Sequence, residues 1–344
     1  MRRTHALTIS LPILLLAGVL FLSPISAHAL TLTPVRLEIS GNAGDTLSQE
    51  MTLINERDTA ETYYVSYANF EAQGETGSPT YVDAHDDLGT WMSAPESVFL
   101  APGASKIVPI KITIPKDADA GGHFAVIFWG TAPNKVAPGE VAIGSKTGML
   151  VLLRVNGDVT ENGGILEFGT KNAQKLYTSL PVNFSYRFQN SGGDRVKPAG
   201  TVIIKDMIGL TATKIPGNPV EGNILPASVR RFETAWSGRD GAIPVEEKDA
   251  GNFFTKAGRE WHNFAFGRYR ATMTLAYGTK NQTTTGTTVF WVLPWHLSLL
   301  IIVLLLLAFF VGRTLIRRYN HWVISRAEEL LAEREAHHAA HKKK

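Results

Sequence analysis

The stretch "APGASKIVPIKITIPKDADAGGHFAVIFWG", residues 101–130, has the order of elements that a β-sandwich requires. Pro102-Gly103 is a turn signal. Apolar residues then alternate with polar ones, which predicts a strand with one buried face: Val108, Ile110, Ile112 and Ile114. Pro115 lacks an amide hydrogen and ends this strand. After a Gly-Gly crossover, "HFAVIFWG" is apolar on both faces, which predicts a central strand covered on each side.

The same pattern extends in both directions from this stretch. Short strands separated by turn signals fill residues 30–156, and a second set follows the polar segment "NGDVTENGG", residues 156–164. The clearest strands of the second set are "PVNFSYRFQN" and "RYRATMTLAYG". Helical periodicity is almost absent before residue 293. The sequence therefore predicts an all-β exported region of two immunoglobulin-like antiparallel β-sandwich domains, residues 30–156 and 157–292.

The two predicted domains also contain similar sequence motifs in the same order. Each has a strand that ends in an asparagine followed by a turn, Asn55 in the first domain and Asn190 in the second. "APGASKIVPI" has its counterpart in "LPASVRRFETAW", and "AGGHFAVIFWG" in "FGRYRATMTLAYG". We interpret them as two divergent copies of one sandwich.

The N-terminus has the features of a secretory signal peptide. Residues 1–29 begin with two arginines, continue through an apolar run and end at Ala27-His-Ala29, an A-x-A site. Cleavage before Leu30 is the natural interpretation, and an uncleaved signal anchor is the alternative.

A second apolar run, residues 293–312, predicts a single transmembrane helix, because 20 residues at ~1.5 Å each span the ~30 Å hydrocarbon core. Aromatic and basic residues at its two ends are the expected interface anchors: Trp291, Trp295, Arg313, Arg317 and Arg318. The basic side places residues 313–344 in the cytoplasm and the sandwiches outside the cell membrane. A short cytoplasmic helix from about Trp322 is expected to dock on anionic lipid or to pair with a partner.

Charge and cysteine content exclude several classes of function. Residues 30–293 hold 24 basic and 27 acidic side chains, so this region lacks the basic surface of a nucleic-acid-binding protein. The chain has no cysteine, which excludes thiol catalysis and disulfides. "DAHDD", residues 83–87, has the ligand types of a metal site but no known spacing, and a solvated loop explains it better. The sequence predicts no enzyme, no cofactor and no metal.

Several of these segments resemble a known family. "LTPVRLEI", the asparagine at a strand end and "LAPGASKIVPIKITIPKDADAGGHFAVIF" resemble the WxL-interacting bacterial surface proteins. The second unit, with "NSGGDRVKPAGTVIIKDMIG", is similar to Ig-like domains that accompany such regions. The resemblance implies a peptidoglycan-binding exported region, a further β domain, a membrane helix and a basic tail.

Aromatic side chains near loops are the candidate ligand-binding residues. Tyr81 and Trp91 flank the long polar loop, and Trp129 ends a strand. Flat aromatic faces bind sugar polymers, but large aromatics are more often buried.

The leading hypothesis is a single-pass bacterial surface protein that binds peptidoglycan or a wall-associated protein. The alternatives are a membrane-tethered chaperone or assembly factor that pairs a sheet edge with a subunit's strand, and a signal transducer acting through the tail. An edge strand free of proline and charge would favour the assembly factor.

Overall fold

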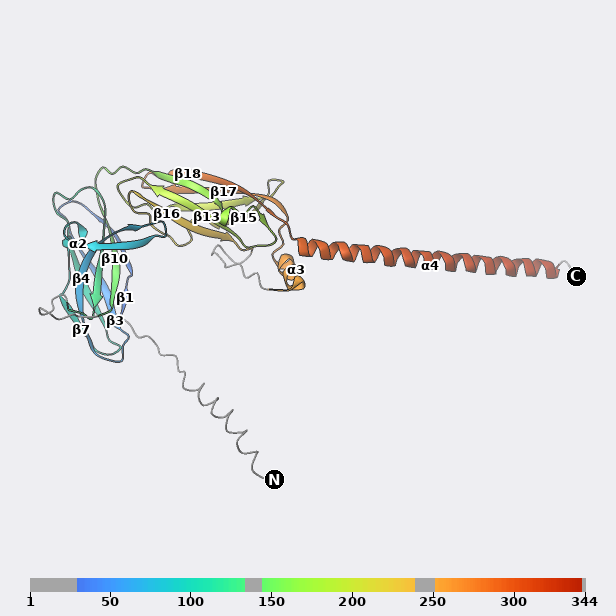
Figure 1. Cartoon of the computed structure of the whole chain (residues 1–344), viewed down its shortest axis with the longest axis horizontal. Coiled ribbons are helices and arrows are strands. Elements are labelled where there is room, and N and C mark those ends of the chain that lie inside the picture. Colours follow the sequence, from blue (N-terminus) through green and yellow to red (C-terminus); the bar gives the residue numbers. More distant parts are fainter. Residues whose placement is uncertain (1–29, 134–143, 239–250, 342–344) are drawn as a thin grey trace, which may run out of the picture. The chain divides into compact units, whose positions relative to one another are not determined.

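In the computed structural model, which describes residues 30–133, 144–238 and 251–341, two compact units can be separated (Figure 1). Unit 1 takes in the described residues of Met1–Glu71 and Pro79–Thr160, and unit 2 those of Ala72–Ser78 and Glu161–Lys344. The predicted signal peptide, residues 1–29, lies outside the described residues. Each unit is a sandwich of two sheets, which confirms the predicted fold class.

Unit 1 packs a four-stranded sheet against a larger one. The first sheet has the order β1 (Leu30–Thr33), β3 (Thr46–Asn55), β8 (Ser105–Thr113), β6 (Met92–Ser93). The second has the order β2 (Arg36–Gly41), β10 (Lys146–Val155), β9 (Gly121–Gly130), β4 (Glu61–Gln73), β5 (Ser78–Asp83), with β7 (Ser97–Leu100) also paired to β4. A one-turn helix, α2 (Leu88–Trp91), precedes β6.

The first strand of unit 1 is divided between the two sheets. β1 pairs antiparallel with β3, and β2 pairs parallel with β10 over six residues. Pro34 lies between them and has no N–H to continue the first ladder. The chain therefore closes one side of the sandwich by contributing to both sheets.

The core of unit 1 confirms the alternation in the opening stretch. Its four alternating residues on β8 and at the start of the following loop are each at most 1% exposed: Val108, Ile110, Ile112 and Ile114. On β9 the residues Ala125, Ile127 and Trp129 join this core. The intervening Phe124, Val126 and Phe128 are also buried, so β9 is covered on both faces, as predicted.

Unit 2 repeats the arrangement of unit 1. One sheet has the order β11 (Gly163–Thr170), β13 (Val182–Asn190), β16 (Ser228–Trp236). The other has the order β12 (Leu176–Tyr177), β18 (Gln282–Val292), β17 (Gly267–Tyr277), β14 (Ala199–Lys205), β15 (Thr211–Pro216), and a 3₁₀ turn, η1 (Lys171–Ala173), precedes β12. The divided first strand recurs, because β11 pairs antiparallel with β13 and β12 pairs parallel with β18.

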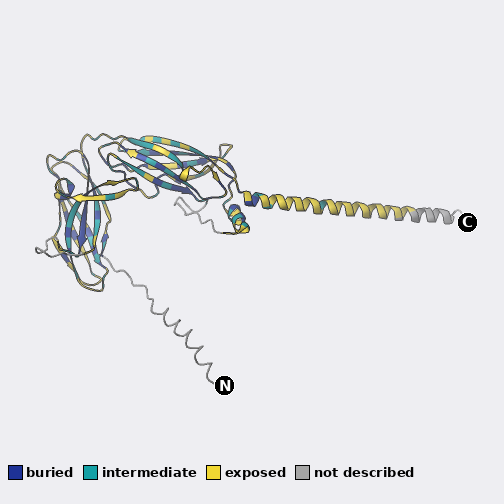
Figure 2. Ribbon diagram, in the orientation of Figure 1, coloured by how far each residue is buried: buried dark blue, intermediate teal, exposed yellow. Residues whose placement is uncertain are grey.

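Two helices complete the described part of unit 2. α3 (Phe253–His262) was not predicted; Asn252 caps it by accepting a hydrogen bond from the Thr255 N–H at 2.9 Å. α4 (Trp295–His341) is one continuous helix and contains the one described segment long and apolar enough to cross a membrane, Trp295–Glu328. The separate helix expected from about Trp322 is continuous with it, because residues 313–341 contain no proline or glycine. Figure 2 shows α4 buried at its first turn and mostly exposed along the rest of its described length.

Candidate functional site

The structure separates the three aromatic residues that the sequence suggested as a ligand site. Tyr81 is 47% exposed on β5 and packs edge-on against Phe128, with ring centroids 5.1 Å apart. Trp91 lies on α2, partly buried against the core of unit 1. Trp129 is fully buried, and its indole N–H points at the Met51 sulfur, 3.3 Å away. Trp129 as a surface ligand residue is therefore wrong: β9 is apolar on both faces, so its alternation does not show which side reaches solvent.

A polar cluster joins the "DAHDD" segment to β9. The His123 Nδ1 lies 2.5 Å from the Asp87 carboxylate, and its Nε2 lies 2.9 Å from the Asp119 carbonyl. Its ring is tilted against that of Trp91, with centroids 4.7 Å apart. Burial acts to lower the pKa of His123, but these hydrogen bonds and the charges of Asp87 and Asp119 outweigh it, so the pKa is raised. Across the described residues, no group of three or more acidic or histidine side chains could hold a metal ion. We interpret the cluster as a set of contacts that holds the loop of residues 83–87 against β9.

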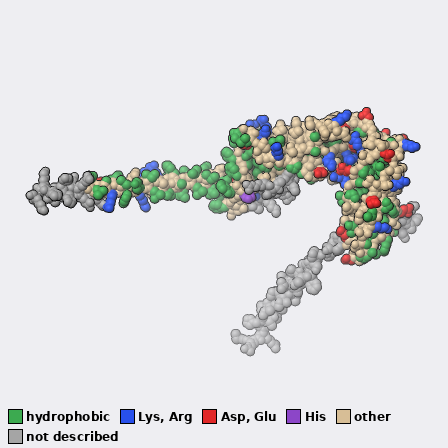
Figure 3. Space-filling model, turned by 180° about the vertical axis from the view of Figure 1, so that it is seen from behind, with side chains coloured by type: hydrophobic (Ala, Val, Ile, Leu, Met, Phe, Trp, Pro, Cys, Tyr) green, Lys and Arg blue, Asp and Glu red, His purple; other side chains and the backbone are tan. Residues whose placement is uncertain are grey.

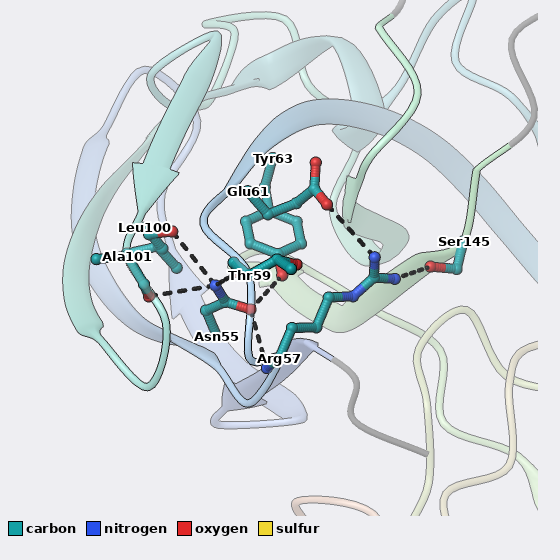
Figure 4. A network of polar contacts seen from close by, with 8 residues as sticks. All are labelled: Asn55, Arg57, Thr59, Glu61, Tyr63, Leu100, Ala101 and Ser145. Carbon is teal, nitrogen blue, oxygen red and sulfur yellow. Dashed lines mark hydrogen bonds and ion pairs between the residues drawn. The ribbon is translucent and has the colours of Figure 1, made fainter. Parts of the chain in front are cut away.

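A second polar network surrounds Asn55, which is fully buried at the end of β3 (Figure 4). Its amide nitrogen donates to three carbonyl oxygens, those of Thr59 at 2.9 Å, Ala101 at 3.2 Å and Leu100 at 3.3 Å. Its oxygen accepts from the Arg57 N–H at 3.1 Å and the Tyr63 hydroxyl at 2.9 Å.

Asn190 occupies the same place in unit 2. It donates to the carbonyls of Asp194 at 2.7 Å and Ile224 at 3.0 Å, and it accepts from the Gly192 N–H at 3.0 Å. In both units the asparagine accepts from the residue two positions on and donates to the residue four positions on. The repeated network is a turn-fixing feature of the sandwich, and it supports the interpretation of two divergent copies.

The edges of the sheets are the remaining candidates for a binding site. On β8, the Lys111 carbonyl accepts from the Ser93 hydroxyl, so odd-numbered residues direct their backbone groups to the open side. Pro109 is among them and has no N–H to offer. On β15, Lys214 and Pro216 have the same blocking character. Both edges are protected against the addition of a strand.

β18 has an edge of a different kind. Its sequence, "QTTTGTTVFWV", contains neither proline nor charge and is rich in β-branched residues. β12 pairs with it only at Trp291 and Val292, and no other described strand pairs with it on that side. In unit 1 the equivalent lane beside β10 is occupied by β2 over six residues. No described strand pairs with β18 from Gln282 to Phe290 on that side, and we call this unpaired edge the vacant lane; β11 of the opposite sheet lies close to it.

The short length of β12 explains the vacancy. Before it, η1 includes Asn172 and Ala173 with φ of 58° and 55°, a left-handed conformation that interrupts an extended chain. Trp291 donates its N–H to the Lys175 carbonyl at 2.8 Å on this side. Odd-numbered residues of β18 thus direct their backbone groups into the lane. β11, in the opposite sheet, reaches β18 through the Thr284 side chain, which accepts from the Ile165 N–H at 3.2 Å.

An open pocket of about 780 Å³ adjoins the last part of β18. Three cationic side chains and four residues of β18 line it: Lys175, Arg268, Arg270, Thr287, Thr288, Val289 and Trp291. Of these residues the sequence indicated a role only for Trp291, as an interface anchor. The run of threonines without proline or charge is the sequence signal for this edge. The absence of a neighbouring strand, in contrast, leaves no local pattern in the sequence.

Comparisons with known proteins place the likeness of this chain at the level of fold. No family model and no curated protein sequence matches it. Among solved structures it is similar to the class 5 fimbriae chaperone CfaA, with 11% identity over 76% of this chain and 99% of that chain, and a TM-score of 0.37. It is also similar to the E. coli chaperone DraB, with 11% identity over 77% and 98% of the two chains, and a TM-score of 0.33. The CsuC-CsuE chaperone-tip adhesion subunit complex of Acinetobacter baumannii matches with 11% identity over 75% and 97%, and a TM-score of 0.34.

Proposed function

We propose that this protein is a membrane-tethered assembly factor that holds an extended segment of another exported protein along the open edge of β18. The vacant lane beside residues 282–290 carries the proposal, since the equivalent lane of unit 1 is filled by β2. An extended peptide there would complete the sheet of unit 2 as β2 completes that of unit 1.

Backbone hydrogen bonds would supply the affinity. Four residues turn their N–H and C=O groups into the lane: Thr283, Thr285, Thr287 and Val289. Each hydrogen bond contributes about 1 kcal/mol net, so several in register, with side-chain contacts, support a reversible complex. Because such bonds do not depend on the partner's side chains, this edge suits partners of varied sequence.

α4 would hold this edge at the membrane through which the partner is exported. The exposed Arg313, Arg317 and Arg318 on α4 favour the orientation in which the C-terminus is cytoplasmic and the sandwiches are outside. Trp295, 47% exposed in the first turn of α4, would lie at the interface on the outer side. Tethering confines both proteins to a thin layer and raises the effective concentration of the edge.

The test begins with the full chain in its own membrane. A photo-crosslinking amino acid replaces Thr287 beside the lane or, as a control, Thr274, which is exposed on β17 in the middle of the same sheet. A synthetic peptide that covers the segment crosslinked only from position 287 is then titrated against the full chain in nanodiscs. We expect the peptide to slow amide hydrogen exchange at residues 285, 287 and 289.

The matched variants are Thr285→Pro, which removes one N–H from the lane, and Thr285→Val, which retains it. We expect Thr285→Pro to weaken peptide binding by about tenfold or more, and Thr285→Val to leave it nearly unchanged. Equal binding by both variants, or slower exchange at Thr274 instead, would refute capture along β18.

The wall-binding hypothesis is a second candidate, and the exposed face of Tyr81 favours it. Full-length protein in detergent would be co-sedimented with insoluble peptidoglycan across a salt series. Saturable binding that falls on Tyr81→Ala but survives Thr285→Pro would favour this candidate over strand capture. Binding that is unaffected by Tyr81→Ala would remove the aromatic contact on which it depends.

A further inference from the structure

The end of unit 2 from which α4 emerges exposes large apolar side chains. α3 presents Phe254 and Trp261, which are 70% and 72% exposed, and Phe264 and Phe266 follow it at 62% and 50%. The turn between β14 and β15 adds Ile208, which is 75% exposed. An exposed group of large apolar side chains is unusual on the surface of a soluble protein. Figure 3 shows hydrophobic side chains gathered where α4 begins.

α3 is fixed to the first turn of α4 by a buried carboxylate. Glu260, 2% exposed, accepts from the Leu297 N–H at 2.7 Å and lies 2.6 Å from the His296 Nδ1. The Phe253 ring packs against Trp295 and His296, with centroids 6.2 and 5.4 Å apart. α3 therefore has a set orientation relative to the membrane helix.

The outer face of α3 is apolar along its length. Phe254, Gly258 and Trp261 have the i, i+4, i+7 spacing of one helical face, which adjoins the side that buries Ala257 and Glu260. The apolar side chains of α4 are exposed from Leu299 on, so a bilayer crossed by this helix would begin next to this face. Tryptophan and phenylalanine at that level favour the membrane interface.

Cationic side chains border this apolar end. On the outer face of their sheet, Arg268 lies opposite Trp291 and Arg270 opposite Val289, and Lys175 lines the same pocket. None of the three forms an ion pair with a carboxylate of the described residues. Two guanidinium groups and an ammonium beside an interfacial tryptophan match a phosphate that lies at the membrane surface.

We propose that the α4 end of unit 2 lies in the headgroup layer of the bilayer, with the outer face of α3 inserted and an anionic phospholipid held by Arg268, Arg270 and Lys175. The protein then has two contacts with the membrane, the span and a lipid-binding platform at the base of unit 2. This inference is independent of the proposed capture of a strand.

The chain contains no cysteine, so single labels report the position of α3 directly. Gly258→Cys has room for a label, with no atom within 4 Å of an added Cβ. Lys280→Cys, exposed in the turn between β17 and β18 at the other end of the sheet, is the control. Full-length protein in phosphatidylcholine nanodiscs carries a fluorophore at either site.

We expect nitroxide-labelled acyl chains to quench the label at 258, and iodide in water to quench the label at 280. Phe254→Ser with Trp261→Ser should return the label at 258 to water. Accessibility to iodide at 258 that equals that at 280 would overturn the insertion of α3.

The headgroup is tested by adding phosphatidylglycerol. We expect phosphatidylglycerol to move the label at 258 deeper into the bilayer. Arg268→Gln with Arg270→Gln should weaken the apparent affinity for phosphatidylglycerol by about 30-fold, because each surface cation contributes about 1 kcal/mol. Lys214→Gln, an exposed cation on β15 in the same sheet, should have no effect. A response retained in the double variant would overturn the lipid site. Competition by inorganic phosphate at equal concentration would also overturn it, in favour of a free anion.

Discussion

Replacing Asn55 with alanine should destabilise unit 1 more than replacing Asn190 destabilises unit 2. Asn55 makes five hydrogen bonds and Asn190 makes three, and both side chains are fully buried. At about 1 kcal/mol net for each bond, the losses approach ~5 and ~3 kcal/mol. Water that enters the space left by the amide would reduce both values but not their order.

Amide hydrogen exchange of the full chain in nanodiscs measures the two units separately, so it does not require two-state unfolding. We expect Asn55→Ala to speed exchange in β3 and β8 by about 30-fold or more, and Asn190→Ala to do so mainly in β13 and β16. Tyr63→Phe, which removes one of the five bonds to Asn55, should change exchange by about fivefold. A change in exchange rate below about tenfold for Asn55→Ala, or equal changes in both units, would refute the assignment that each network stabilises its own unit.

Two further outcomes follow from unit 1. Trp129→Ala should destabilise the unit by about 3–5 kcal/mol in urea unfolding of the full chain, whereas Tyr81→Ala should stay within about 1 kcal/mol, and similar effects would contradict their assigned burial. The raised pKa of His123 means that its pairing with Asp87 stabilises the fold fully below about pH 6.5 and loses this contribution as pH rises through the native pKa. The stability difference between wild type and His123→Gln should therefore shrink as the pH rises above about 6.5, and a constant difference would show that this pair is not the source.

The sequence predicted the strands because their alternation is local. The apolar residues of β8 and of β13 are spaced by two, and each set faces the core of its own unit, so periodicity alone identifies them. Asn55 and Asn190 were visible as strand-end residues for the same reason. Where both faces of a strand are apolar, as on β9, periodicity loses this power, and the burial of Trp129 followed only from the packing of two sheets.

The candidate sites depend on an absent neighbouring strand and on contacts between residues far apart in the sequence. Local sequence patterns predict neither. The open edge of β18 exists because β12 pairs over two residues rather than six, and η1, more than a hundred residues earlier in the chain, sets that length. α3 could have been identified from its asparagine cap, but its face pattern is short, and its contact with α4 depends on Glu260 and His296 meeting across a whole strand pair.

The two units differ at the sheet edge on which the proposed function depends. In unit 1 the lane beside the last strand is filled by the chain itself, and the exposed edge of β8 carries Pro109. In unit 2 no described strand fills the corresponding lane beyond β12, its strand carries no proline or charge, and its far end adjoins the first turn of α4. A sandwich that only served as a spacer would gain nothing from an unprotected edge, because such an edge invites aggregation. Divergence of one copy toward an open lane near the start of α4 is what the proposed capture of a strand would require.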